Sequence, residues 1–282
     1  MLISRALSAV VIVGLTALFV YLGGLPFLAF IVTVSAVATY EYDRMLLHRG
    51  FCPFSLATVA LGVAFVVDAQ FGYDIWRWAI VAAVLLPLVW LVAGYRSGSC
   101  SREMPQALAD WSVSFVGALY VGVPMSHFVL LRQMNQGNSW AELPPGLWWV
   151  ALVLLGTWAA DTGAYLSGSV FGRHGFMTRI SRRKTWEGTI GGVLLSLLVV
   201  VLMGVFILNL HLIQSLVLGV VIGPAAIVGD LAESVLKRGA GVKDSGSIIP
   251  GHGGMLDRID SMIFTVVMVY YLALVFTRWS LS

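Results

Sequence analysis

The sequence contains little charge. Asp, Glu, Lys and Arg make up 11% of its 282 residues and hydrophobic residues make up 59%, whereas about 25% of residues are charged in an average soluble domain. This composition excludes an ordinary soluble domain. Apolar windows of about 20 residues, long enough to cross a hydrocarbon core, recur along the whole chain. We therefore predict an all-α, polytopic integral membrane protein.

Cysteine is also scarce. Cys52 and Cys100 are the only cysteines, and both fall in loops predicted to face the cytoplasm, where thiols stay reduced. Two cysteines without paired histidines do not make a zinc site. We expect both residues to be bystanders to the function.

The apolar windows divide the chain into nine predicted membrane spans. The spans are centred on residues 11–22, 25–40, 56–67, 78–92, 111–130, 147–167, 189–208, 216–236 and 261–276. The third and fourth are the shortest and are interrupted by Gly62 and Pro87. The first resembles a signal peptide in position, but only Arg5 precedes it and its cleavage pattern is weak, so we expect a retained helix.

The basic residues predict the orientation of the chain, because Lys and Arg are retained on the cytoplasmic side. With the N-terminus inside, 14 of the 17 Lys and Arg residues fall in inner loops, which leaves Arg77, Arg132 and Arg278 outside. We therefore predict a multi-pass protein of the cell (inner) membrane, with a cytoplasmic N-terminus and an outer C-terminus.

The placement of charge changes near Leu147. Before it, charged residues lie at the ends of the predicted spans, as ordinary loop residues, in groups such as "EYDRMLLHRG". After it they lie within the spans or directly next to them. We predict that residues 1–146 form an N-terminal transmembrane scaffold of five helices. Residues 147–282 are predicted to form a C-terminal catalytic region of four helices, with signature loops on the cytoplasmic side.

Three charged clusters mark the C-terminal region. In "TWAADTGAYLSGSVFGRHG", Asp161 follows a long apolar run, where a carboxylate costs about 2.5 kcal/mol or more unless it faces a polar cavity or a partner. The basic loop "RISRRKTWEGT" contains Lys184 and Glu187, and it could be only a topology anchor. The third cluster extends from "GDLAESVLKRG" through "VKDSGSIIPGHGGMLDRID".

The third cluster begins on a helix and continues into a glycine-rich loop. Asp230, Glu233 and Lys237 are spaced i, i+3 and i+7, so they share one helical face, which we expect to be wet. Six glycines and a proline after Arg238 exclude a continuous helix, and their backbone N–H groups suit phosphate oxygens. The last span then begins among acidic residues.

The lysines of the chain are confined to these clusters, beside a concentration of carboxylates. The lysines are residues 184, 237 and 243, and the carboxylates are residues 161, 187, 230, 233, 244, 257 and 260. Carboxylate oxygens suit Mg²⁺, and lysine and arginine suit phosphate, which is the combination that phosphoryl or nucleotidyl transfer requires. These features predict a membrane-embedded, cation-dependent site for a phosphate compound.

Several of these residues also have a simpler structural interpretation. Glu233 and Lys237 could form an ordinary i, i+4 ion pair. Asp161 could be a structural hydrogen-bonding residue. Glu187 could cap a helix or orient Lys184.

The stretch 234–260, "SVLKRGAGVKDSGSIIPGHGGMLDRID", resembles the signature of the phosphatidate cytidylyltransferases, also called CDP-diacylglycerol synthases. That signature is Ser-x-apolar-Lys-Arg, four residues, Lys-Asp, then Pro or Gly, x, His-Gly-Gly, apolar, x, Asp-Arg, apolar, Asp, and every fixed position matches. The stretches "DTGAYLSGSVFGRH" and "KTWEG" are similar to two further blocks of the family. One departure is visible in "SRRKT", where Arg182 stands in the usual place of a proline.

The resemblance implies transfer of CMP from CTP to phosphatidic acid, giving CDP-diacylglycerol and pyrophosphate, an early step of phospholipid biosynthesis. It further implies a mostly helical membrane enzyme that forms a homodimer. The expected partners are CTP, phosphatidic acid and the lipid bilayer, without nucleic acid.

The resemblance also implies roles for individual residues. The two metal-binding aspartates of the family match Asp230 and Asp257, which we expect to hold Mg²⁺. Glu233 and Asp260 are further candidate ligands, and K⁺ is a candidate second cation. The predicted catalytic residues are Asp230, Asp257, Lys237, Lys243 and Lys184. The predicted substrate-binding residues are Arg183, Glu187, Arg238, Asp244, His252, Gly253, Gly254, Arg258 and Asp161.

Two other functions remain open from the residues alone. One is a related CTP-dependent lipid-phosphate cytidylyltransferase or lipid kinase, because no feature of the sequence indicates which lipid tail the substrate carries. The other is a cation-coupled transporter of an anionic solute, because intramembrane carboxylates also mark ion pathways. Against transport, the charged clusters all face one predicted side, and the two halves show no inverted symmetry.

Overall fold

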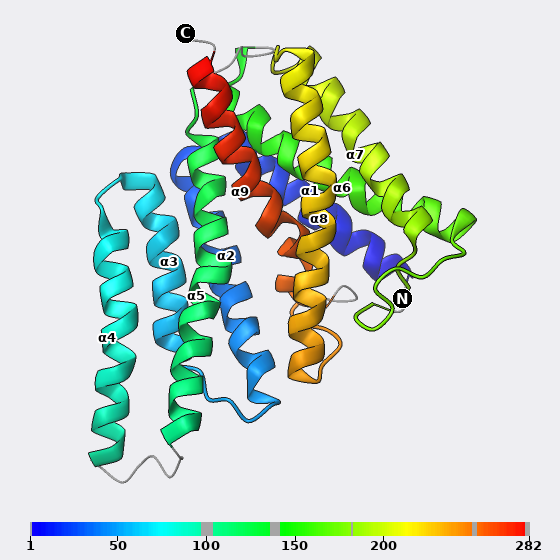
Figure 1. Ribbon diagram of the computed structural model, residues 1–282. Helices are drawn as coiled ribbons and strands as arrows, with labels where there is room; N and C mark the ends of the chain where they lie inside the picture. Colours follow the sequence, from blue (N-terminus) through cyan, green and yellow to red (C-terminus); the bar gives the residue numbers. More distant parts are fainter. Residues whose placement is uncertain (1, 97–103, 136–141, 182, 250–252, 280–282) are drawn as a thin grey trace. The chain divides into compact units, whose positions relative to one another are not determined.

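The computed structural model describes the chain except for residues 1, 97–103, 136–141, 182, 250–252 and 280–282. His252, Arg182 and Cys100 therefore lie outside the described residues. The part that is described folds into nine helices (Figure 1). They are α1 (Leu2–Leu22), α2 (Gly24–Leu47), α3 (Ser55–Phe71), α4 (Ile75–Arg96), α5 (Met104–Arg132), α6 (Pro145–Phe171), α7 (Trp186–Phe206), α8 (Leu212–Ala240) and α9 (Leu256–Trp279).

The all-α prediction is confirmed, and each predicted span overlaps one of these helices. Over the described residues, six helical segments are long and apolar enough to cross a membrane. They are Gly24–Leu47, Gln106–Arg132, Pro145–Phe171, Trp186–Phe206, Leu212–Ala240 and Leu256–Phe276. Two shorter apolar helices, Ser8–Leu22 and Ser55–Phe71, accompany them.

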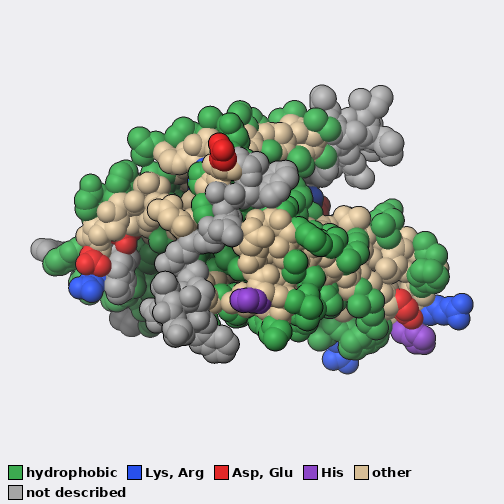
Figure 2. Space-filling model, turned by 90° about the horizontal axis from the view of Figure 1, so that it is seen from above, with side chains coloured by type: hydrophobic (Ala, Val, Ile, Leu, Met, Phe, Trp, Pro, Cys, Tyr) green, Lys and Arg blue, Asp and Glu red, His purple; other side chains and the backbone are tan. Residues whose placement is uncertain are grey.

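The surface is apolar over wide areas. On the face shown in Figure 2, hydrophobic side chains predominate and charged ones are few. Leu56, Val170 and Ile213 are among many large apolar side chains that are exposed. Contiguous apolar surface of this kind is rare on soluble monomers, whereas lipid tails solvate it well. The chain is a multi-pass membrane protein.

The helices belong to two compact units. The first unit comprises residues 1–129 and 239–258, and the second comprises residues 130–238 and 259–282. In the first, Leu61, Phe65, Ala79 and Ala118 form a buried apolar cluster between α3, α4 and α5. These units divide the chain by packing. The predicted division by function, at residues 146 and 147, stays a prediction.

Helix α2 is longer than the apolar window that predicts it. The window ends at Tyr40 because acidic residues follow, yet the helix continues to Leu47. Glu41 and Asp43 are buried within it, with 2% and 0% of their surface exposed. The interpretation of these two carboxylates as ordinary loop residues at a span end is therefore wrong. They lie buried inside the first unit.

Helices α6 and α7 pack closely in the second unit because small residues face one another. A Cβ at Gly163 would lie 2.7 Å from the carbonyl oxygen of Gly191, and one at Gly192 would lie 2.6 Å from that of Ala160. No side chain fits between the two backbones there. This packing places Thr185, at the end of the loop before α7, beside Gly168 at the C-terminal end of α6.

Candidate active site

The loop between α6 and α7 is held in a defined conformation. Phe176 N donates to Lys184 O at 2.8 Å, and Trp186 N donates to His174 O at 2.9 Å. Thr185 caps α7, because its hydroxyl accepts a hydrogen bond from Gly188 N at 3.1 Å. Lys184 therefore sits directly before the N-terminus of a helix, a position that favours anions.

A cavity of about 350 Å³ opens beside this loop, within the second unit. Its charged lining residues are Asp161, Arg183, Lys184 and Asp230, and its other lining residues are Ala160, Ala164, Tyr165, Gly168, Ser169, Thr185, Gly188, Thr189 and Ile227. Asp161 thus lines a cavity together with charged side chains of both signs, so its carboxylate does not face only apolar groups. The small residues keep the cavity open.

Two residues of this cavity form an ion pair. Lys184 Nζ lies 2.6 Å from Asp230 Oδ2, and both side chains are partly exposed. Asp230 Oδ1 also accepts a long hydrogen bond of 3.5 Å from Ser234 Oγ. The basic loop and α8, distant in sequence, therefore meet at one carboxylate. This pairing gives the loop a role beyond a topology anchor.

Glu187 organises the loop and does not pair with Lys184. Its Oε1 lies 2.6 Å from His174 Nδ1, and its Oε2 accepts hydrogen bonds from Arg173 N and His174 N at 3.2 and 3.3 Å. The suggestion that Glu187 orients Lys184 directly is therefore wrong. Its predicted contact with substrate stays a prediction.

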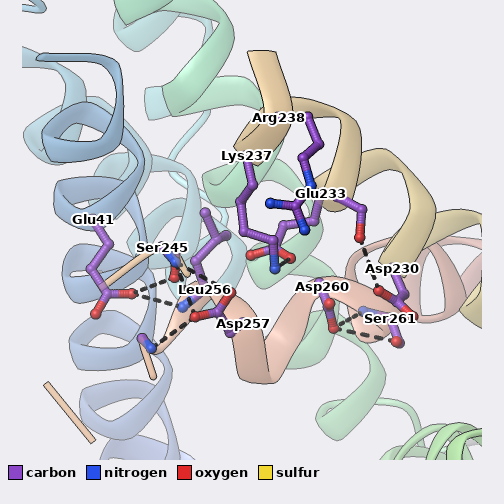
Figure 3. Close-up of polar contacts among 12 residues, drawn as sticks. Glu41, Asp230, Glu233, Lys237, Arg238, Ser245, Leu256, Asp257, Asp260 and Ser261 are labelled. Carbon is purple, nitrogen blue, oxygen red and sulfur yellow. Dashed lines mark hydrogen bonds and ion pairs between the residues drawn. The ribbon is translucent and has the colours of Figure 1, made fainter. Parts of the chain in front are cut away.

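Helix α8 carries a second ion pair, one turn beyond Asp230. Glu233 is fully buried and its Oε2 pairs with Lys237 Nζ (Figure 3). The expected i, i+4 pair is confirmed. The expectation of a wet face is wrong for Glu233, whose charge is neutralised within the helix instead. Arg238, the next residue, is exposed and approaches Ile180 O at 3.5 Å.

Asp260 joins Asp230 in the second unit because α8 and α9 approach closely. A Cβ at Gly229 would overlap the carbonyl oxygen of Asp260. Asp260 is close enough to Asp230 for the two charges to repel and close enough to Lys237 to be partly neutralised. Its Oδ1 accepts hydrogen bonds from Ser261 N at 2.6 Å and Ser261 Oγ at 3.3 Å.

The remaining signature residues belong to the first unit. Asp257 lies in the first turn of α9, and its Oδ2 accepts hydrogen bonds from Ser245 N at 3.0 Å and Gly254 N at 2.9 Å (Figure 3). Gly253 has a positive φ of 85°, which a side chain would strain. Lys243, Asp244 and Arg258 are exposed. His252 is outside the described residues.

Sequence reasoning missed one carboxylate, Glu41. From α2 it accepts hydrogen bonds from Ser245 Oγ and Leu256 N, in the loop that precedes α9 and at its first residue. The available signal was its place next to a long apolar run, the same signal that identified Asp161. Glu41 was overlooked because the first half of the chain was expected to be only a scaffold.

The donor set suits Mg²⁺. Within the second unit, Asp230 and Asp260 offer only carboxylate oxygens, the ligands of a hard ion. Within the described residues no group of three or more acidic, histidine or cysteine side chains is arranged as a complete metal site. Mg²⁺ does not require one, because it is commonly held by one or two carboxylates, waters and substrate phosphates. Convergence of Asp230 and Asp257 stays a prediction.

Comparison with known proteins agrees with this chemistry. The model of the cytidylyltransferase family matches residues 3–276. Phosphatidate cytidylyltransferase of Synechocystis sp. is 36% identical over 289 residues, covering 95% of this chain and 94% of the relative. Phosphatidate cytidylyltransferase of Bacillus subtilis is 30% identical over 281 residues, covering 97% and 98%. The chain therefore belongs to the cytidylyltransferase family, together with the phosphatidate cytidylyltransferases.

Proposed function

We propose that this protein is an enzyme that transfers CMP from CTP to phosphatidic acid and releases pyrophosphate. The observation that carries the proposal is the Lys184–Asp230 ion pair at a cavity lined by four charged residues, in a chain whose full-length relatives are phosphatidate cytidylyltransferases. Lys184 can bind a negatively charged phosphate, and Asp230 can bind the cation that accompanies it. The product is CDP-diacylglycerol, which stays in the bilayer.

The lipid phosphate is proposed to bind at the cavity in the second unit. Arg183 and Lys184 line it beside the N-terminus of α7, and both are phosphate-binding side chains. Asp161 and Glu187 are assigned to the same half of the site, Glu187 through its hold on the loop. The exposed apolar side chains of α6 and α7 leave the acyl tails in contact with lipid.

The triphosphate is proposed to bind to the signature residues. Lys237, Arg238 and Lys243 supply positive charge, and Asp244, His252, Gly253, Gly254 and Arg258 complete the binding loop. Asp230 and Asp257 are the proposed ligands of Mg²⁺, with Glu233 and Asp260 as further candidates and K⁺ as a candidate second cation. Held by these carboxylates, such an ion would neutralise phosphate charge.

The reaction is an in-line displacement. An oxygen of the phosphatidate phosphate forms a bond to the α-phosphorus of CTP, and the bond from that phosphorus to the oxygen shared with the β-phosphate breaks. The electron pair of the broken bond leaves with pyrophosphate. Because a phosphate monoester is largely ionised near neutral pH, the chain needs no strong general base. Its residues act by positioning and by neutralising charge.

We also propose that all nine helices cross the inner membrane, with the N-terminus and the site on the cytoplasmic side. The distribution of Lys and Arg supports this orientation, since 14 of 17 would face inward. Membrane-impermeant labelling of single cysteines placed at Arg49 and Arg77 tests it. Labelling of position 77 alone in intact cells is expected, and labelling of position 49 alone would reverse the topology.

A homodimer is the proposed assembly, and its support is the family resemblance. Cross-linking in native membranes, followed by mass measurement of the detergent-solubilised protein, tests it. We expect a mass of two chains, and a mass of one chain in both measurements would contradict the assembly.

The activity is tested with CTP labelled in the cytosine ring and a panel of lipids in proteoliposomes. We expect the label in lipid when phosphatidic acid is supplied. Transfer only to another lipid phosphate would identify a related cytidylyltransferase. Entry of unchanged CTP into the liposomes would identify a transporter and contradict the proposal.

A further inference from the structure

Glu41 extends from α2 to the start of α9 within the first unit. Its carboxylate is buried, and Oε2 accepts hydrogen bonds from Leu256 N at 2.9 Å and Ser245 Oγ at 3.3 Å (Figure 3). Leu256 is the first residue of α9, and its N–H is one of those that a helix leaves without an intrahelical acceptor. Glu41 therefore caps α9 from another helix.

The loop backbone closes on this carboxylate from two sides. A Cβ at Gly246 would overlap Glu41 Oε1, and a Cβ at Gly254 would overlap Glu41 Oε2 and Ser245 Oγ. Glycine at both positions permits the close approach. The carboxylate is thus in direct contact with the loop backbone on both sides. A side chain buried by chance would not need a glycine at each of these positions.

The partners of Glu41 also fix Asp257. Ser245 donates its hydroxyl to Glu41 and its backbone N–H to Asp257, and Leu256 directly precedes Asp257 in α9. Gly254 N donates to Asp257 as well, at 2.9 Å. Glu41 therefore acts on Asp257 through the same residues that hold the Asp257 carboxylate in place.

A buried carboxylate is a costly way to fill space, because burial disfavours its charge unless strong hydrogen bonds compensate. A charge-assisted bond is stronger and more directional than a neutral one. Glutamate at position 41 is therefore better explained by the directional hydrogen bonds that it forms with the loop than by packing.

We propose that Glu41 is a positioning residue for nucleotidyl transfer, which holds the loop and Asp257 in the arrangement that receives the nucleotide and its cation. This inference rests on the function proposed above. Glu41 itself touches no reactant. Residues that orient a metal ligand in this way typically contribute about 10- to 100-fold to metal affinity or activity.

Hydrogen exchange of the purified protein without nucleotide or metal gives the first test. In Glu41→Ala, the amides of Ser245, Gly254 and Leu256 are expected to exchange about tenfold faster or more, because their acceptors are lost or loosened. Glu41→Gln keeps a carbonyl oxygen in place and is expected to restore most of the protection. Unchanged exchange in Glu41→Ala would overturn the proposal.

Asp43→Asn is the matched control. It alters a second buried carboxylate of α2, which faces Ser55 and Thr58 of α3. We expect it to leave exchange at Ser245 and Leu256 unchanged. Should it speed exchange there equally, the effect of Glu41 would be general loosening of α2 and the proposal would fail.

Steady-state kinetics separates positioning from bulk stability. In Glu41→Ala the Mg²⁺ concentration for half-maximal rate is expected to rise by about 10- to 100-fold, with the KM for phosphatidic acid little changed and with partial recovery in Glu41→Gln. Equal changes in all constants would contradict positioning. An inactive wild-type protein would refute the proposed function, whereas an active wild type with an unaltered Mg²⁺ requirement in Glu41→Ala refutes only this inference.

Discussion

Lys184, directly before α7, and Asp230, in α8, form an ion pair with 2.6 Å between Nζ and Oδ2. Each residue comes from a different charged cluster, so the pair joins the basic loop to the signature helix. It also leaves Asp230 neutralised and half-buried. The pair connects the proposed lipid-phosphate cavity to the proposed metal ligand.

Lys184→Met should lower kcat/KM by about 10- to 100-fold, the effect of losing a charge-assisted bond of about 1.5–3 kcal/mol. Lys184→Arg should retain part of the activity. Arg179→Ala is the control, because Arg179 is an exposed residue of the same loop and does not line the cavity. Coupling of the pair is measured on the free energy of unfolding, because Asp230→Asn is expected to abolish turnover. Additive effects of Lys184→Met and Asp230→Asn on that free energy in the double variant would show that the pair is not coupled.

Asp230→Asn and Asp257→Asn should each abolish turnover while the protein stays folded, since the change removes a charged ligand and keeps the side-chain shape. EDTA should abolish wild-type activity, and added Mg²⁺ should restore it. Size-exclusion profiles and melting temperatures in detergent check the folding. Normal activity of both variants at low Mg²⁺ would refute their role as ligands.

Glu187→Ala should raise the KM for phosphatidic acid several-fold with a smaller change in kcat. The reason is that Glu187 holds the backbone of Arg173 and His174, and this loop presents Lys184. His174→Ala removes only one of these contacts and should have a weaker effect. A loss of kcat with an unchanged KM would place Glu187 in the chemical step instead.

Gly163→Ala should destabilise the protein by about 1–3 kcal/mol, the usual result of overpacking. Its Cβ would lie 2.7 Å from the carbonyl oxygen of Gly191, a backbone atom that cannot rotate away. Gly14→Ala in α1 is the control, since a Cβ there meets nothing within 4 Å. Thermal unfolding in detergent compares the two. Equal melting temperatures would contradict the tight α6–α7 packing.

The local features of the fold could be predicted from the sequence. The apolar windows overlap each helix of the described part of the chain, because length and hydropathy determine what a bilayer accepts. The Glu233–Lys237 pair followed from helical spacing alone. The end of α2 was missed because the window stopped at the first charged residue, whereas the buried Glu41 finds its partners far along the chain.

The tertiary features of the site could not be predicted in this way. Sequence spacing does not reveal that Lys184 meets Asp230 or that Glu187 meets His174, because these contacts depend on how helices pack. The glycines at 163, 191, 192 and 229 are visible in the sequence, but only the packed helices show which backbones they allow to approach. The identity of the signature residues came from resemblance, and their mutual positions require the fold.

The most direct test of the central claim compares CTP labelled with ³²P at the α- and at the γ-phosphate, incubated with the purified protein and phosphatidic acid. We predict that the α-label enters the lipid as CDP-diacylglycerol while the γ-label is released as pyrophosphate. Entry of the γ-label into the lipid would identify a phosphoryl transfer and contradict cytidylyl transfer.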